Sequence, residues 1–311
     1  MMPVTSAIEP LRLANRSAER QLYEWSMYSV DGQPVAASNG LITAVVGNLE
    51  TVPAQATIVV CGGLNIQQHT DRRLIAWLRK VARRGNDIGA LCTASHILAE
   101  AGLLEGHRCT IHWENLPGFA EAFPDINVTG SLFEIDRDRF SSAGGTSALD
   151  MMLSLISGQH GPDLAAEVAE TILHSPVRHQ NEHQRMSLPA RIGARHPKLV
   201  SIIEQMEQNL EDPLSPSILA RQAGLSTRQL ERLFRRYLDR SPKRYYLELR
   251  LRKARSLLLQ TDMSVINVAL ACGFSSPSHF SKCYRAFFGR TPYRERGIPT
   301  LESVVSGAAA E

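Results

Sequence analysis

The chain has 311 residues, a length typical of two domains, and its 43% hydrophobic and 21% charged content excludes collagen-like, disordered and disulfide-scaffold proteins. No stretch approaches the ~20 consecutive apolar residues of a membrane helix, and no basic segment followed by an apolar run opens the chain. The net charge of +3 is uneven, because residues 1–195 carry 16 Lys and Arg against 20 Asp and Glu, whereas residues 196–311 carry 18 against 11. We therefore expect a soluble, unexported protein without a membrane partner, whose second half has a polyanionic partner.

Between residues 24 and 155, short β-rich runs alternate with amphipathic helical runs, which predicts an α/β layer fold. Strands are predicted over residues 57–61 and 87–91, and a two-stranded ribbon over residues 131–135 and 139–143. Helices are predicted over residues 71–84, 94–102, 146–156 and 162–174. A polar run, residues 175–196, follows. The predicted division is an α/β domain (1–160), a helix and linker (161–196), an all-α domain (197–298) and a flexible tail (299–311).

The α/β part contains one candidate site. Cys92 follows a predicted strand and precedes a helix, which is the strand-to-helix elbow that exposes a nucleophile at a helix N-terminus. A helix dipole supplies only ~0.3–1 kcal/mol, too little to turn a thiol of pKa ~8.5 fully into thiolate at pH 7. We therefore interpret Cys92 and His112 as a vestigial catalytic pair in a ligand pocket. The predicted lining residues are Gly62, Gly63, Cys92, Thr93, His112 and Trp113.

Other residues give no sign of a metal or a cofactor. The five cysteines are an odd number and form no CxxC pair, which argues against a disulfide framework or a zinc site and fits a reducing cytoplasm. His179 and His183 stand four residues apart without a Cys or carboxylate partner in a recognisable pattern, so we interpret them as linker residues. Trp77 shares an apolar helix side with Leu74 and Val81 and is expected in the core.

The all-α part contains one pattern twice, about 50 residues apart. Residues 218–226 (ILARQAGLS) indicate a short helix, a glycine turn and a serine N-cap that opens a second helix, and residues 268–276 (VALACGFSS) repeat this. Both are helix-turn-helix signatures. The expected core positions of the two second helices are Leu230, Leu233, Phe234 and Tyr237, and then Phe280, Tyr284 and Phe287.

Outward positions on the two second helices are polar and mostly basic. Arg and Lys donate to guanine or phosphate, and Ser and His bond base edges or the backbone, so these faces suit a DNA groove. The predicted DNA-facing residues are Arg228, Glu231, Arg232 and Arg235, and then Ser278, His279 and Lys282. A long helix over residues 241–260 is expected to span about 30 Å, close to the ~34 Å that separates successive major grooves on one face of DNA.

Residues 197–297 resemble the AraC/XylS DNA-binding domain, through GFSSPSHFSK at residues 273–282, FGRTP at residues 288–292 and Arg294. This resemblance implies a transcriptional activator that acts with double-stranded DNA and RNA polymerase. Residues 1–160 resemble the PfpI-type, class I glutamine amidotransferase-like flavodoxin-like fold, through the elbow at Cys92 and the segments TIHW and AGGTSALDMMLSLI. The combination resembles GlxA-type regulators, which implies a homodimeric bacterial sensor of small amines, amino acids or betaines at the nucleoid.

The α/β part departs from the PfpI pattern in one respect. The acidic residue that PfpI-type enzymes place near the first strand corresponds to Ser6, and Glu9 lies one turn further along. The first strand itself is missing, because the chain opens immediately before the first helix; either the start site is assigned late or the sheet lacks a strand. Two alternatives to a ligand-responsive regulator stay open, a cysteine-dependent hydrolase and a redox sensor at Cys92, the second without an identifiable resolving cysteine.

Overall fold

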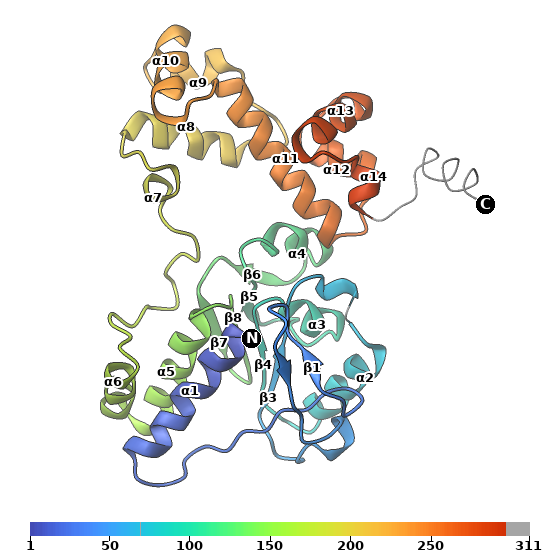
Figure 1. Cartoon of the computed structure of the whole chain (residues 1–311), viewed down its shortest axis with the longest axis vertical. Helices are drawn as coiled ribbons and strands as arrows, with labels where there is room; N and C mark the ends of the chain where they lie inside the picture. The colour runs from blue at the N-terminus through green and yellow to red at the C-terminus, as the bar shows by residue number, and fades with distance from the viewer. Residues whose placement is uncertain (69, 297–311) are drawn as a thin grey trace, which may run out of the picture. The chain divides into compact units, whose positions relative to one another are not determined.

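The computed structural model describes residues 1–68 and 70–296 and separates into two compact units, Met1–Gln184 and Arg185–Glu311 (Figure 1). The predicted tail, residues 299–311, lies outside the described residues. None of the described helices is long and apolar enough to cross a membrane. The first unit combines strands and helices, and the described elements of the second are all helical, so the predicted α/β and all-α classes of the two halves are confirmed.

A four-stranded sheet forms the centre of the first unit, in the order β3-β4-β8-β7. Its strands are β3 (Ile58–Cys61), β4 (Ile88–Leu91), β7 (Phe133–Asp136) and β8 (Arg139–Ser142). β3, β4 and β8 are parallel, with Ile58 opposite Ile88 and Ile88 opposite Arg139, and β7 runs antiparallel to β8. Smaller pairs are β1 (Val35–Ala36) with β2 (Ile42–Thr43), antiparallel, and β5 (Arg108–Thr110) with β6 (Asn127–Thr129), parallel.

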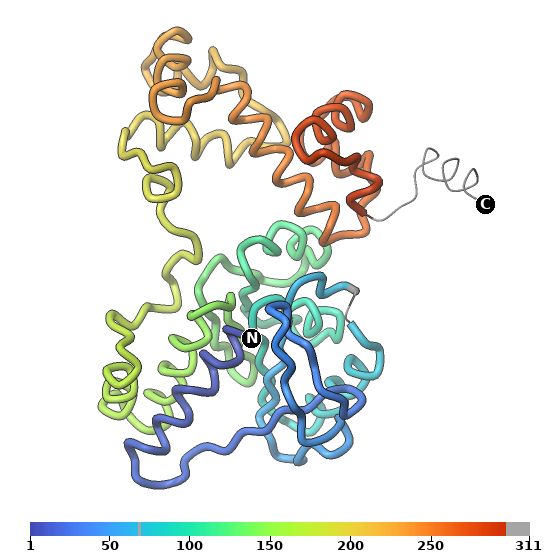
Figure 2. Tube along the Cα trace, viewed as in Figure 1, coloured from blue at the N-terminus to red at the C-terminus, as the bar shows by residue number. Residues whose placement is uncertain are grey.

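Helices cover both faces of the sheet, because side chains along each strand alternate between the faces. Ile88 and Ala90 join the core beneath α2 (Arg72–Ala82) and α3 (Ser95–Glu100). Leu91 joins the core beneath α1 (Met2–Ser17) and α5 (Ser147–His160). Figure 2 shows α1 lying alongside α5 and α6 (Pro162–Thr171). The remaining helices of this unit are α4 (Leu116–Ala122) and the 3-10 turns η1 (Leu49–Thr51) and η2 (Ile66–Gln68).

The predicted strands and helices of the first unit are present, with one difference in pairing. The expected ribbon forms between β7 and β8, but β8 also pairs with β4 and so belongs to the central sheet. Burial explains this, because all four residues of β8 are buried and the Phe140 ring lies over Gly89, where a Cβ would come within 2.0 Å of it. A ribbon by itself would leave that ring exposed to water.

The segment expected to be a helix and linker is divided between the two units. Helix α6 packs against α1 and α5, with Val168 fully buried, and residues 172–184 stay with the first unit. Helix α7 (Leu188–Ile192) belongs to the second unit, where Leu188 joins the core of the helices that follow it.

The second unit is built on two hydrophobic cores. Its helices are α8 (Pro197–Gln208), α9 (Pro216–Gln222), α10 (Thr227–Leu238), α11 (Pro242–Gln260), α12 (Val265–Ala271), α13 (Pro277–Phe288) and α14 (Pro292–Glu295). Tyr246 of α11 is buried in the first core, and Leu251 and Leu258 of the same helix are buried in the second. Most of these helices begin at a hydroxyl that accepts a backbone N–H, which fixes where each turn ends. These caps are Ser215, Ser226, Ser241, Ser264, Ser276 and Thr291.

The two glycine turns give a matched test of the fold. Gly224 and Gly273 both have positive φ, +61° and +72°, but a Cβ on Gly273 would lie 2.6 Å from the carbonyl oxygen of Glu211, whereas one on Gly224 would meet only Lys198 Nζ, at 3.8 Å. Backbone strain predicts that Gly224→Ala costs about 1 kcal/mol, and the clash predicts about 1–3 kcal/mol more for Gly273→Ala. Calorimetric unfolding of the full chain measures both, and equal costs would contradict the packing described.

Candidate nucleic-acid interface and ligand site

The backbone at Cys92 forms a strained elbow between β4 and α3. Cys92 has a φ of +64°, a conformation that a non-glycine residue rarely adopts. Its N–H donates to the Ser142 carbonyl at 2.9 Å, which ties the elbow to the end of β8. The elbow needs glycine beside it, because a Cβ on Gly144 would lie 2.9 Å from Cys92 Sγ.

Other residues of the predicted pocket meet at this elbow. Thr93 Oγ1 donates to the Gly63 carbonyl at 2.7 Å, and a Cβ on Gly62 would lie 2.4 Å from the Ala94 nitrogen. The His112 backbone N–H donates to the Cys92 carbonyl at 3.3 Å. His112 therefore lies next to the elbow, and Trp113 is the next residue in the chain. The structure therefore brings together segments that are up to about fifty residues apart in the sequence.

The elbow does not favour a thiolate. Burial raises the pKa of the Cys92 thiol above its usual range, and the charge of Glu114 raises it further. A hydrogen bond from the Thr93 backbone lowers this pKa, but by less than burial raises it. Burial lowers the pKa of His112 by more than the charge of Glu114 raises it, so the imidazole is mostly neutral at pH 7. The His112 ring lies beside Trp113, at 5.7 Å between ring centroids, and its Nδ1 lies 3.8 Å from Glu114 Oε2. Glu114 is the acidic residue near this site, and the sequence reasoning did not select it.

The residues considered for acid or metal chemistry have other roles. Glu9 Oε2 forms an ion pair with Arg12 at 2.7 Å on α1. His183 pairs with Ser131 in an isolated β-bridge, and in the described part of the chain no cluster of His, Cys, Asp and Glu side chains is arranged to hold a metal ion. Trp77 packs against the core beneath α2, as expected.

The second helix of each helix-turn-helix unit has one buried and one exposed face. On α10, Leu230 and Phe234 are fully buried, and the four predicted DNA-facing residues are exposed. On α13, Phe280 and Tyr284 are fully buried, and the three predicted DNA-facing residues are exposed. The exposed sets are Arg228, Glu231, Arg232 and Arg235 on α10, and Ser278, His279 and Lys282 on α13.

Two details of these helices differ from the sequence-based expectation. The helical spacing predicts Tyr237 in the core, but it is 37% exposed: its ring lies beside the His196 ring, at 5.5 Å between centroids, and below the Arg236 guanidinium. The His279 side chain does not simply project outward, because its Nε2 lies 3.4 Å from Cys283 Sγ, one turn along α13.

The elbow leads to a prediction about reactivity. Because burial and the Glu114 charge both disfavour the thiolate, Cys92 should be alkylated by iodoacetamide with a pH midpoint above the ~8.5 of an ordinary thiol. Peptide-resolved mass spectrometry of the full chain measures this midpoint, and Glu114→Gln should lower it. Complete alkylation of Cys92 at pH 7 on the timescale of free cysteine would contradict the arrangement.

Comparisons with known proteins agree with both halves of the chain. A helix-turn-helix domain model matches residues 219–297, and the DJ-1/PfpI family model matches residues 5–158. The transcriptional regulator GbdR of Pseudomonas aeruginosa is 47% identical over 98% of this chain and 83% of its own length. The regulator CdhR of the same species is 46% identical over 97% of this chain and 90% of its own, and GlxA of Rhizobium meliloti is 38% identical over 94% and 90%.

Among solved structures, an AraC-type regulator from Chromobacterium violaceum is 53% identical to the part of this chain that it matches. It covers 32% of this chain and 90% of its own, with a TM-score of 0.32. The full-length relatives, together with the two family models, settle the assignment. The chain belongs to the family of HTH-type transcriptional regulators that join a DJ-1/PfpI domain to an AraC-type helix-turn-helix domain.

Proposed function

We propose that this regulator reads a specific duplex through α10 and α13 and responds to a small amine, amino acid or betaine held at the Cys92 elbow. The observation that carries the DNA-binding part is the pair of helices with one face buried and the other exposed and polar, joined through α11. Nineteen residues of α11 span about 28 Å, close to the ~34 Å between successive major grooves. One protomer therefore reaches two groove segments.

The exposed side chains of α10 and α13 suit base edges. Arg228 and Arg232 lie one turn apart on α10 and are able to donate to guanine O6 and N7, and Glu231 is able to accept from cytosine N4. Ser278 and Lys282 stand in the same relation on α13. Both recognition helices begin at a serine cap, so their backbone N–H groups favour nearby phosphates.

Arg232→Ala should lower the preference of the full chain for its selected duplex over a scrambled one by about 5- to 150-fold, which corresponds to ~1–3 kcal/mol for a lost base contact. Fluorescence anisotropy at one salt concentration measures both affinities. Arg72→Ala, which changes an exposed arginine of the first unit, is the control. An unchanged preference in Arg232→Ala would remove this residue from the reading face, and equal binding of both duplexes by the unaltered chain would refute sequence-specific binding.

The elbow suits a ligand that carries a cationic nitrogen. The Trp113 side chain is 39% exposed beside the mostly neutral imidazole of His112, and the Glu114 carboxylate is exposed next to it. An indole face and a carboxylate together attract an ammonium group, and a quaternary ammonium in particular. The protonated Cys92 thiol and the backbone near Gly62 and Gly63 present uncharged polar groups to the rest of the ligand.

Trimethylglycine, glycine and ethanolamine represent the three proposed ligand classes in a thermal-shift test of the full chain. The compound that binds should stabilise the first unit by about 2.7 kcal/mol at ~100 times its Kd. Trp113→Ala and Glu114→Gln should each reduce this stabilisation, whereas Trp25→Ala, which removes a comparably exposed indole, should not. Stabilisation that is unchanged in the first two variants would place the ligand elsewhere.

A connecting segment, defined as residues 174–184, is anchored on both sides of the elbow. Asp150 of α5 is fully buried and binds His174 Nε2 at 2.7 Å and Arg178 Nη2 at 2.6 Å. The same Arg178 nitrogen donates to Thr146 Oγ1 at 2.7 Å, two residues beyond the Gly144 that packs against Cys92.

The far end of the connecting segment is anchored beside His112. Gln184 Nε2 donates to Thr110 Oγ1 at 2.9 Å, to the Ile111 carbonyl at 3.0 Å and to the Ser131 carbonyl at 2.9 Å. Ile111 immediately precedes His112, and Gln184 immediately precedes the second unit. A ligand that shifts either side of the elbow therefore changes the hydrogen bonds of the segment that leads to the DNA-binding unit, which supplies the differential contact that allostery requires.

Gln184→Ala should separate ligand binding from DNA binding. It should keep the thermal shift caused by the bound compound, because Gln184 bonds to Thr110, Ile111 and Ser131 and to none of the predicted lining residues. It should reduce the compound's effect on DNA affinity. Gln159→Ala, which removes an amide bonded to Tyr23 Oη, is the control. Full retention of the ligand effect in Gln184→Ala would exclude this route of coupling.

As for its partners, we propose a homodimer that places four recognition helices on its operator and acts with RNA polymerase as an activator at the bacterial nucleoid. The second half of the chain carries a net positive charge and the first half a net negative one, which supports nucleic acid as the partner of the second half. Sedimentation of the full chain with and without its operator measures the stoichiometry of the complex.

A further inference from the structure

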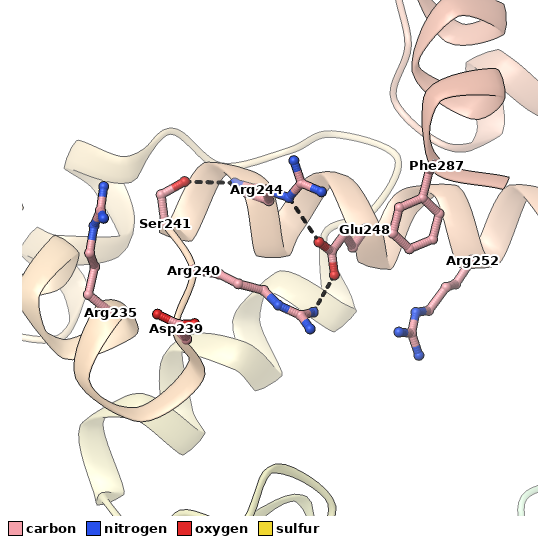
Figure 3. Close-up of a pocket in the computed structure, with 8 residues that line it drawn as sticks. All are labelled: Arg235, Asp239, Arg240, Ser241, Arg244, Glu248, Arg252 and Phe287. Carbon is pink, nitrogen blue, oxygen red and sulfur yellow. Dashed lines mark hydrogen bonds and ion pairs between the residues drawn. The ribbon is translucent and has the colours of Figure 1, made fainter. Parts of the chain in front are cut away.

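A basic hollow of about 600 Å³ lies in the second unit, where α10 ends and α11 begins (Figure 3). We call it the arginine hollow. The charged residues that line it are Arg235, Arg240, Arg244 and Arg252, with Asp239 and Glu248. Four guanidinium groups against two carboxylates leave it with a net positive charge, so it is suited to an anion.

A buried carboxylate fixes two of these arginines. Only 8% of the Glu248 side chain is exposed, and it forms an ion pair with Arg240 and accepts a hydrogen bond from Arg244 Nε at 3.2 Å. Figure 3 shows the two guanidinium groups reaching Glu248 from different sides. A buried carboxylate without cationic partners is costly, so Glu248 holds both arginines in place before any ligand arrives. Each guanidinium keeps further N–H groups for a ligand, because an arginine has five.

The other two arginines of the hollow have no carboxylate partner in the part of the chain that the structure describes. Both residues, Arg235 and Arg252, are exposed. Exposed guanidinium groups beside two fixed ones form a cluster whose mutual repulsion an anion would relieve. The cluster therefore has both the charge and the donors for an oxyanion with several accepting oxygens.

The position of the hollow relative to the recognition helices indicates which anion it binds. Arg235 lies two turns beyond Arg228 on the exposed face of α10, so the hollow continues the predicted reading face. Phe287 of α13 lines the hollow from the other helix-turn-helix unit, and Glu248 and Arg252 belong to α11 between them. DNA that presents two successive major-groove segments to α10 and α13 must carry its sugar-phosphate backbone across this intervening region.

We propose that the arginine hollow binds phosphodiester groups of the DNA backbone between the two major-groove segments, with Glu248 as the residue that positions Arg240 and Arg244. This inference rests on the proposed DNA-binding function. Such contacts fix the register of the protein on the duplex and add affinity without reading sequence, because every nucleotide presents the same phosphate. They complement the base-facing residues, whose loss changes sequence preference.

The test measures how the affinity of the full chain for its selected duplex and for a scrambled duplex depends on salt between 50 and 200 mM. Arg252→Gln should weaken binding to both duplexes by the same factor and reduce the slope of log K against log salt by about 1. The unaltered chain should then lose about 4-fold more affinity across this range than the variant does. Arg240→Gln should behave alike, and Arg240→Lys, which keeps the charge, should retain most of the slope.

Arg84→Gln removes an arginine of the first unit that is also exposed, and it should leave both affinities and the slope unchanged. Thermal unfolding of each variant identifies any loss of affinity that comes from misfolding, and Arg252 gives the cleaner variant because no ion pair is lost with it. Slopes for Arg252→Gln and Arg240→Gln equal to that of Arg84→Gln would overturn the proposal, while a retained sequence preference in the unaltered chain would leave the proposed function standing. Equal binding of both duplexes by the unaltered chain would instead refute the proposed function.

Inorganic phosphate distinguishes a backbone site from a site for a free anion. Under the proposal, millimolar phosphate competes only weakly with DNA for the hollow, and it causes no saturable rise in the unfolding temperature of the full chain. Saturable stabilisation that Arg252→Gln abolishes, together with an unchanged salt slope, would assign the hollow to a free anion and overturn the assignment to DNA.

Discussion

Helix α11 is packed into two hydrophobic cores at once, its first half with the first helix-turn-helix unit and its second half with the other. Each end of α11 is held in one core, and a regular helix has a fixed rise per residue. The spacing of α10 and α13 is therefore set by the nineteen residues of α11. The proposed reading of one duplex by α10 and α13 depends on this spacing, because two exposed faces fit successive major grooves only when they match the repeat of the DNA. The arginine hollow lies along the same helix, so its position is set by the same constraint.

Buried carboxylates organise the parts of the molecule that the proposed function uses. Asp150 anchors His174 and Arg178, and so holds the connecting segment to α5. Glu248 holds two arginines of the hollow, Arg240 and Arg244, and Glu295 binds Arg255 at 3.0 Å and so joins α14 to α11. In each case an acid that is out of water needs cationic partners, and at least one partner lies outside the helix that carries the acid. The same requirement that stabilises each contact therefore fixes the position of a functional segment.

The elbow at Cys92 keeps the backbone geometry of a nucleophile in a setting that disfavours one. The positive φ, the close packing of Gly144 and the hydrogen bond to Ser142 are retained, while burial and Glu114 act against the thiolate. A protonated thiol beside a mostly neutral imidazole is a weak nucleophile, and this agrees with the proposed role of the elbow in binding a small molecule rather than transforming it.

The sequence by itself determined what depends on short-range pattern. Alternation and helical periodicity predicted the strands, the helices and the two fold classes, and the repeated glycine turn with its serine cap predicted both helix-turn-helix units, because caps and turns are decided by a few neighbouring residues. It also selected the exposed residues of α10 and α13, whose roles at DNA stay a prediction.

Only the tertiary structure decided what depends on distant contacts. Strand β8 pairs inside the central sheet, the Tyr237 ring packs against His196 instead of in the core, and Gln184 bonds to Thr110, 74 residues away. Glu114 near the elbow and the burial of Glu248 were missed for the same reason, since the burial and charge around one residue are set by packing that no local period encodes.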